Sequence, residues 1–205
     1  MNMQEIRDVA RKKLKGYCRV CKVCDGVACA GEVPGMGGVG TGASFKANIQ
    51  ALANCKLNLR TLHDAKDPDI EVNIFGKKLS MPIMAAPITG STYNMGGKVS
   101  EEEYISAVMS GCKAVGTIAM CGDGGDPLFY DSGIEAMKRE KGYGIGIIKP
   151  RENHKIIEKA KKAQEVGAVA VGVDVDGAGL VTMALMGQPV GPKNRDELKE
   201  IISSV

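Results

Sequence analysis

The sequence predicts an α/β protein built on parallel strands. Beyond residue 81, short apolar runs alternate with amphipathic segments, and turn residues such as Gly and Pro separate them. The runs are continuously apolar, which is typical of strands buried on both faces of a parallel sheet. Helices that return the chain between such strands form right-handed crossovers. The fold class is therefore α/β, and these patterns alone do not distinguish an open sheet from a closed barrel.

Length and composition suit a globular protein with a small-molecule ligand. The chain has 205 residues, 44% of them hydrophobic, which is enough for one domain with a substantial core. A formal charge of +3 is too small and too dispersed to indicate a nucleic-acid partner. The first 14 residues lack the apolar core of a secretory signal, and no stretch reaches the apolar length of a membrane span. We therefore expect a cytoplasmic protein whose seven cysteines are thiols or metal ligands rather than disulfides.

The chain divides into residues 1–80, which precede the repeats, and residues 81–205, which carry them. Apolar stripes among charged residues predict two helices in the first part, at residues 3–15 and 45–55. An alternating run turned at Gly76 predicts a β-hairpin that leads into the repeats. The first part therefore holds N-terminal helices, a Cys/Gly-rich loop and the lead-in hairpin.

Four cysteines lie within 12 residues after the first helix, in the pattern C-x2-C-x2-C-x4-C: Cys18, Cys21, Cys24 and Cys29. Such spacing lets thiolates converge on one metal, so these residues are candidate ligands for zinc or an iron–sulfur cluster. Reduced thiols that fill a tight segment are the structural alternative. A Gly-rich run at residues 31–42 follows, and no strand precedes it. We therefore interpret that run as a loop near the mouth of a site rather than a dinucleotide-binding turn.

The repeats begin with the apolar run at residues 81–90. Pro82 and Pro87 would break a helix at both ends of this run, so it is interpreted as a buried strand with a tight turn after it. Ligand sites in α/β proteins lie in the loops that follow the carboxyl ends of strands. The candidate ligand-binding residues of this turn are Pro87, Ile88, Thr89 and Gly90. A plain buried strand without a ligand is the alternative.

The remaining elements follow in alternation. Apolar runs predict strands at residues 114–119, 144–149 and 168–174. Amphipathic segments with capping residues predict helices at residues 101–111, 131–140, 153–166 and 195–205. An irregular loop is expected at residues 180–192.

The stretch from Asp67 to Gly90, with its Pro-x-x-x-Ala-Pro strand, resembles the start of the barrel in the FMN-dependent α-hydroxy-acid oxidases and dehydrogenases, the glycolate and lactate oxidase family. The resemblance covers roughly residues 45–180. It implies a (β/α)8 TIM-type barrel, of which this chain holds about the first four βα units. It also implies FMN as cofactor and hydride transfer to FMN from an α-hydroxy acid such as lactate or a related small acid.

The resemblance assigns roles to individual residues. The backbone after Pro87 would face the flavin, and the hydroxyl of Thr117 would contact it. Asp174 would pair with the catalytic His that lies beyond this chain, and it is the candidate catalytic residue. Lys149, at the end of the third strand, is a candidate cofactor-binding cation. The family's Gln and Tyr on that strand, and its Arg after Asp174, are missing here, so the substrate could differ from a simple 2-hydroxy acid.

Two other functions compete with this one. Another phosphate-binding TIM-barrel enzyme, of the inosine-monophosphate-dehydrogenase or dihydroorotate-dehydrogenase type, would share the repeats. A metal or redox module built on the four clustered cysteines would use the strand–helix repeats as a scaffold. A complete (β/α)8 barrel takes about 250 residues, so we expect this chain alone to be inactive. Half a barrel leaves strand edges open, and we therefore expect a homo-oligomer.

Overall fold

The computed structural model describes residues 1–30 and 41–205, so most of the Gly-rich run lies outside the described residues. The chain forms two compact units. The first comprises Met1–Pro68 and Ser91–Ser100, and the second comprises Asp69–Gly90 and Glu101–Val205. The hairpin thus groups with the strand–helix repeats rather than with the N-terminal helices. Within the described ranges, no helix is long and apolar enough to cross a membrane.

The first unit contains helices α1 (Met3–Lys13), α2 (Ala43–Asn54) and the short α3 (Ser91–Asn94). Asn2 begins α1 with a capping box, because its side chain accepts from the backbone of the first turn and Glu5 accepts the Asn2 backbone N–H in return. The two predicted helices are confirmed, whereas α3 was not predicted. Neither α1 nor α2 has a buried residue.

The second unit opens with the predicted hairpin, β1 (Val72–Ile74) paired antiparallel with β2 (Lys77–Leu79). Phe75 and Gly76 form its two-residue turn, and both have left-handed φ values of 49° and 71°. Two such residues in succession are the signature of a type I′ turn, whose twist matches the twist of the paired strands. Gly76 relieves the strain at one of the two positions.

A parallel sheet of three strands forms the centre of this unit, in the order β3 (Met120–Cys121), β4 (Ile145–Ile148) and β5 (Ala170–Val173). Ala85 adds a parallel bridge to Ala119 on the free side of β3. The prediction of parallel strands is confirmed for these three, although the strand expected at residues 81–90 is reduced to this bridge. The described residues do not close the sheet into a barrel.

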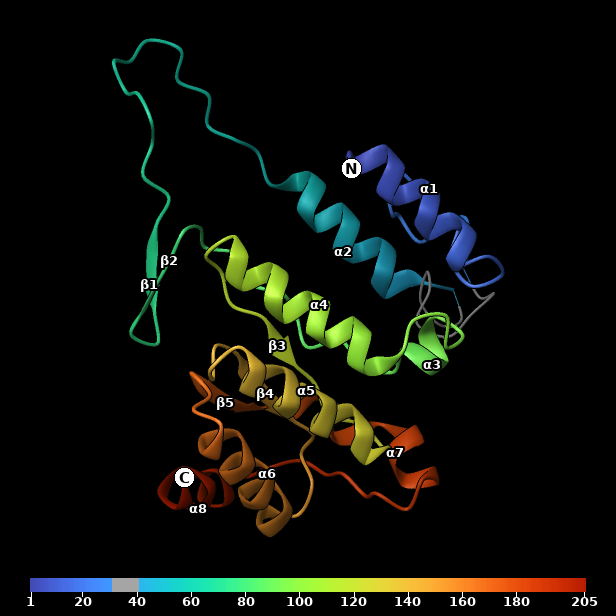
Figure 1. Cartoon of the computed structure of the whole chain (residues 1–205), viewed down its shortest axis with the longest axis vertical. Coiled ribbons are helices and arrows are strands. Elements are labelled where there is room, and N and C mark those ends of the chain that lie inside the picture. Colours follow the sequence, from blue (N-terminus) through green and yellow to red (C-terminus); the bar gives the residue numbers. More distant parts are fainter. Residues whose placement is uncertain (31–40) are drawn as a thin grey trace. The chain divides into compact units, whose positions relative to one another are not determined.

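Helices flank the sheet (Figure 1). They are α4 (Glu101–Ala114), α5 (Pro127–Arg139), α6 (Asn153–Glu165), the 3-10 helix η1 (Val175–Gly179), α7 (Val181–Leu185) and α8 (Arg195–Ser204). Asp126 caps α5 and Pro127 takes its first position, so α5 begins earlier than predicted. The capping box at Asn194 confirms the predicted start of α8.

Two predicted elements are wrong. Residues 114–119 are not a strand, because α4 runs on to Ala114 and Gly116 then turns the chain with a φ of 76°. Residues 117 and 118 are used in crossing from the helix to the sheet, and strand pairing begins only at Ala119. The loop expected at residues 180–192 instead contains α7 in its first part.

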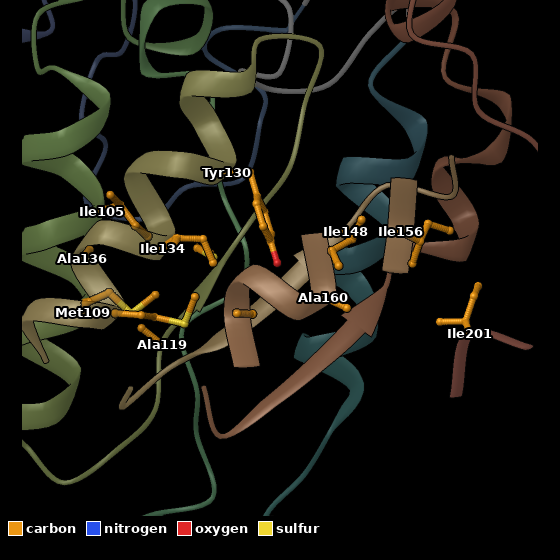
Figure 2. Packing of buried hydrophobic residues seen from close by; sticks show 13 residues of the cluster. Ile105, Met109, Ala119, Tyr130, Ile134, Ala136, Ile148, Ile156, Ala160 and Ile201 are labelled. Carbon is orange, nitrogen blue, oxygen red and sulfur yellow. The ribbon is translucent and has the colours of Figure 1, made fainter. Parts of the chain in front are cut away.

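The core lies where α4, α5, α6 and α8 cover the sheet. Figure 2 shows side chains from all four helices in this cluster, with the Tyr130 ring among them. The fully buried members of largest volume include Tyr130, Ile105, Met109, Met137, Ile148 and Ile156. Burying one large apolar side chain stabilises the fold by about 1.5–3 kcal/mol. The sheet is therefore held rigidly, and its carboxyl ends are fixed in space.

Candidate active site at the carboxyl edge of the sheet

Charged side chains follow each strand of the parallel sheet at the point where it ends. Asp123 follows β3, Lys149 and Arg151 follow β4, and Asp174 follows β5. Parallel strands that are neighbours end at the same edge of a sheet, which is where α/β proteins bind ligands. Four charged groups of both signs therefore gather at one edge.

Asp123 and Arg151 form a sealed ion pair at this edge. Their side chains are 0% and 4% exposed. The Arg151 Nε donates to Asp123 Oδ2 at 2.9 Å, and Nη2 donates to Oδ1 at 3.1 Å. Two parallel bonds of this kind are the strongest arrangement of guanidinium and carboxylate. Arg151 also donates to the Gly124 carbonyl and to the Gln188 side chain, so its donors are used within the protein.

Asp123 receives three further contacts. Its carboxylate accepts the backbone N–H of Lys149 at 3.1 Å and that of Gly124 at 2.9 Å. The Lys159 Nζ lies 3.4 Å from Oδ1. Burial opposes ionisation of Asp123, but the bonds from Arg151 and the charge of Lys159 outweigh burial and lower its pKa below the ordinary value. Asp123 is therefore a carboxylate at neutral pH.

Lys149 and Asp174 form a second, more open ion pair. The Lys149 Nζ donates to Asp174 Oδ2, and the two side chains are 19% and 23% exposed. Burial disfavours the charged form of Asp174, yet hydrogen bonds from Asp176 and Lys149 lower its pKa overall. The pKa of Asp176 is raised, because its hydrogen bond and its repulsion with Asp174 both favour the protonated form. Asp174 is thus the ionised member of this carboxyl pair.

The turn after the first predicted strand lies at the same edge. A Cβ on Gly122 would stand 2.9 Å from both the Pro87 carbonyl oxygen and the Thr89 Cγ2, so this turn lies directly against the β3 loop. Gly90 has a φ of 81°, which favours glycine. The Ile88 side chain is 51% exposed. The structure therefore brings the turn beside Asp123.

The amides of this turn already donate within the chain. The Ile88 N–H donates to the Ala86 carbonyl at 2.9 Å, and the Gly90 N–H donates to Glu101 Oε2 at 3.0 Å. A contact from these two amides to a flavin would have to share or replace those bonds. The assignment of Pro87, Ile88, Thr89 and Gly90 to the cofactor stays a prediction, with the exposed Ile88 side chain as its most accessible group.

Thr117 lies at the other end of its strand. It precedes β3, its side chain is buried, and its hydroxyl donates to the Ile83 carbonyl. The prediction had placed Thr117 at the carboxyl end because it assumed a strand at residues 114–119. Since α4 occupies the start of that range, the strand begins later and Thr117 is at the amino edge, joining two backbone segments. The placement on which its cofactor role depended is therefore wrong.

The four clustered cysteines do not form a metal centre in the described residues. Within the described residues all four are thiols outside any disulfide; Cys21 and Cys24 are exposed, and Cys18 and Cys29 are half-buried. Over residues 1–30 and 41–205, no group of three or more His, Cys, Asp or Glu side chains is placed to hold a metal ion. The backbone N–H of Val20 instead donates to the Cys18 sulfur at 3.3 Å. The zinc or iron–sulfur prediction gains no support from this arrangement.

Sequence reasoning missed the buried pair and its partners. Neither Asp123 nor Arg151 was predicted from the sequence to lie at a site. A signal was present, because unlike charges follow two successive apolar runs within a few residues of their ends. Neighbouring parallel strands bring such positions together.

A family model described as FMN-dependent dehydrogenase matches residues 35–190. Among curated proteins, an L-lactate dehydrogenase of Vibrio parahaemolyticus is 31% identical over 127 residues, which are 58% of this chain and 30% of that enzyme. An L-lactate dehydrogenase of Actinobacillus pleuropneumoniae is 28% identical over 134 residues, 62% of this chain and 32% of the enzyme. The chain thus matches about a third of the length of these relatives.

Solved structures of similar shape include a single-residue variant of mandelate oxidase with benzoyl-formic acid, at a TM-score of 0.64 and 15% identity, covering 98% of this chain and 58% of that one. A flavocytochrome b2 with bound sulfite matches at a TM-score of 0.53 and 15% identity, covering 71% of this chain and 39% of that one. At such low identity these likenesses show a shared fold. They are consistent with a barrel of which the described residues form only part.

Proposed function

The chain belongs to the FMN-dependent dehydrogenase family, and from this premise we propose that it contributes the carboxyl-edge site of an oxidoreductase that transfers a hydride from an α-hydroxy acid to FMN. One observation carries the proposal. The family match at residues 35–190 includes the turn at residues 87–90 and all three strand ends that the structure gathers at one edge. The family also decides against an enzyme of the inosine-monophosphate-dehydrogenase type.

The residues of this edge fit one face of a flavin. Ile88 is an apolar side chain left half exposed beside a loop of small residues, and an aromatic ring system could lie on it. Gly122 leaves the space beside Ile88 unfilled, because a side chain at this position would collide with the turn at residues 87–90. Thr89 adds a hydroxyl, and Lys149 adds a cation at the same edge. Bound FMN would supply the hydride acceptor.

The ionisation of Asp174 suits an orienting role. A carboxylate with a lowered pKa is a poor proton acceptor, because it holds a proton weakly. The same carboxylate stabilises and orients a cationic partner well. Asp174 therefore fits the task of holding a base that becomes positively charged when it takes the hydroxyl proton of the substrate. Hydrogen bonds from Asp176 and Lys149 favour the ionised form of Asp174 before that partner is present.

We propose a small 2-hydroxy acid as the substrate, with L-lactate first among candidates. Support comes from the relatives, which are named L-lactate dehydrogenases, and from the mandelate oxidase structures. The chain carries no Arg in the run after Asp174, so the carboxylate of the substrate needs another cation. Lys149 is a partly exposed cation at this edge, whereas Arg151 is buried. Self-association and a cytoplasmic location stay predictions.

The test is FMN binding by the purified chain, measured by the quenching of flavin fluorescence. We expect saturable binding of one FMN per chain. L-lactate and L-mandelate are then added separately to the FMN-loaded chain under anaerobic conditions, and a change in the flavin absorption spectrum reports substrate binding. Cys21→Ser, an exposed position in the other unit, is the matched control and should bind FMN as the wild type does. No binding of FMN by a folded chain would contradict the proposal.

A further inference from the structure

One buried ion pair joins the segments that follow all three strands. Asp123 accepts the backbone N–H of Lys149, which connects the loop after β3 to the end of β4. Arg151 donates to the Gly124 carbonyl, which connects the same two segments a second time. Arg151 also donates to Gln188, which lies beyond α7 in the segment that follows β5. The Asp123–Arg151 pair is therefore the point at which three segments of the edge meet.

The backbone of Lys149 is held on both sides by this arrangement. Its N–H is bound to Asp123 at 3.1 Å, and its carbonyl accepts the Arg151 N–H at 2.7 Å. Pro150 follows, and its ring fixes the backbone angle between the two bonds. The second of these is a backbone bond, whereas the first depends on the Asp123 carboxylate, which the Arg151 side chain holds in place. The direction in which the Lys149 side chain leaves β4 thus depends on the Asp123–Arg151 pair through the first bond.

The Lys149 side chain then lies close against η1. A Cβ on Gly177 would stand 3.2 Å from Lys149 Cδ and 3.4 Å from its Nζ, so η1 covers the stem of this lysine closely. From there the amine donates to the Asp174 carboxylate. A change in where Lys149 leaves the strand would move its amine away from that carboxylate.

We propose that Asp123 and Arg151 are positioning residues that seat the Lys149 amine on the Asp174 carboxylate. They act through Lys149, since their own polar atoms are sealed from solvent and bonded within the protein. The inference deepens the proposed function, because it rests on that edge being the site, but the seating of Lys149 can be measured without cofactor or substrate.

The pKa of Asp174 reports whether the Lys149 amine is held against its carboxylate. The groups that face its carboxylate are the Lys149 amine from the end of β4, the Asp176 carboxyl from η1 and the backbone N–H of Gly177. Only the first of these is held by the buried pair. Loosening Lys149 therefore removes one stabilising contact from the charged form of Asp174 and leaves the contacts from η1 in place.

The experiment is a carbon NMR titration of the Asp174 side-chain carboxyl in the purified, FMN-free chain. The test variant is Asp123→Leu combined with Arg151→Met, which removes both charges together and leaves neither buried alone. We expect the midpoint of the Asp174 titration to move upward, in the same direction as in Lys149→Met. Lys162→Met, which removes an exposed lysine 3.5 Å from Asp131, is the matched control and should leave the midpoint unchanged.

A folded double variant with an unchanged Asp174 midpoint, alongside a shifted midpoint in Lys149→Met, would overturn the inference. If the double variant does not fold, Arg151→Lys decides, because it keeps the charge but loses the two-pronged contact and should still move the midpoint upward. An unchanged midpoint in folded Arg151→Lys would then overturn the inference. FMN binding is measured on the same samples. Its absence from the wild type would contradict the proposed function without changing the titration result.

Discussion

Two ion pairs stand at the same edge of the same sheet and differ mainly in burial. The Asp123–Arg151 side chains are 0% and 4% exposed, whereas those of Lys149–Asp174 are 19% and 23% exposed. Every polar atom of the first pair is engaged within the protein or beside Lys159, while the second pair shares its carboxylate with the exposed Asp176. The first pair can therefore hold structure, and only the second can meet a ligand.

The difference shows that charge at a strand end does not by itself indicate a site. Both acids have lowered pKa values, so ionisation does not separate them either. Exposure separates them, because chemistry requires access and a sealed carboxylate has none. The following predictions test that separation, beginning with the largest expected effect.

Arg151→Met should lower the free energy of unfolding by about 3–5 kcal/mol, because it leaves the Asp123 carboxylate buried with Lys159 as its only nearby cation. Urea unfolding at neutral pH measures the change. Conversion of Asp123 to Leu in the same chain should restore much of the loss. A cost below about 1 kcal/mol, the range of surface pairs, would mean that the pair is not sealed as the structure shows.

Acid should weaken the same pair by protonating the Asp123 carboxylate. The folded-state pKa of Asp123 is lowered, so its stabilising contribution is present above the unfolded value of about 4 and is lost as the pH falls below it. Protonation leaves the buried Arg151 guanidinium without its counter-charge, but the loss is limited by how far the folded-state pKa of Asp123 lies below the unfolded value. Urea unfolding at a series of acidic pH values should show a flatter profile in the Asp123→Leu, Arg151→Met double variant. Equal slopes in both proteins would contradict this prediction.

Gly122→Ala tests how closely the 87–90 turn lies against the edge. The new methyl group would stand 2.9 Å from the Pro87 oxygen and from the Thr89 side chain, so the turn must shift, at a cost of about 1–3 kcal/mol. FMN affinity should fall with it. Gly111→Ala is the control, since nothing lies within 4 Å of its added carbon. Wild-type affinity in folded Gly122→Ala would place the flavin elsewhere.

Lys149→Met should cost about 1 kcal/mol or less in stability, because the pair is partly open and Asp174 keeps its contacts with η1. Its effect on substrate binding should be larger than its effect on unfolding. Calorimetric titration of the FMN-loaded chain with L-lactate measures the effect on binding, and urea unfolding measures the effect on stability. A stability loss as large as that of Arg151→Met would remove the distinction between the pairs.

Cys21→Ser and Cys24→Ser should change the free energy of unfolding by less than about 0.5 kcal/mol, because both thiols are exposed. Addition of one equivalent of Zn²⁺ should not raise the unfolding midpoint of the wild type. A zinc-dependent rise that is lost in the variants would revive the metal site that the described residues do not form.

The sequence was a good guide to local structure and a poor guide to long-range pairing. The hairpin turn at Gly76, strands β4 and β5 and the cap at Asn194 follow from patterns within a few residues. The Asp123–Arg151 pair joins residues 28 positions apart, so the unlike charges after two successive apolar runs indicate a contact only once those runs are taken as neighbouring parallel strands. Thr117 was misplaced because α4, which packs against α5, runs on to Ala114, so the strand begins later than its apolar run suggests.

Backbone amide NMR shifts on addition of FMN would test the central claim, that the cofactor binds at the carboxyl edge of the sheet, most directly. We expect the largest shifts at Ile88, Thr89, Gly122 and Lys149, and little change at α6 residues on the covered face, such as Ala160. Shifts confined to the cysteine segment at residues 18–29, or no shifts in a folded chain at saturating FMN, would contradict it.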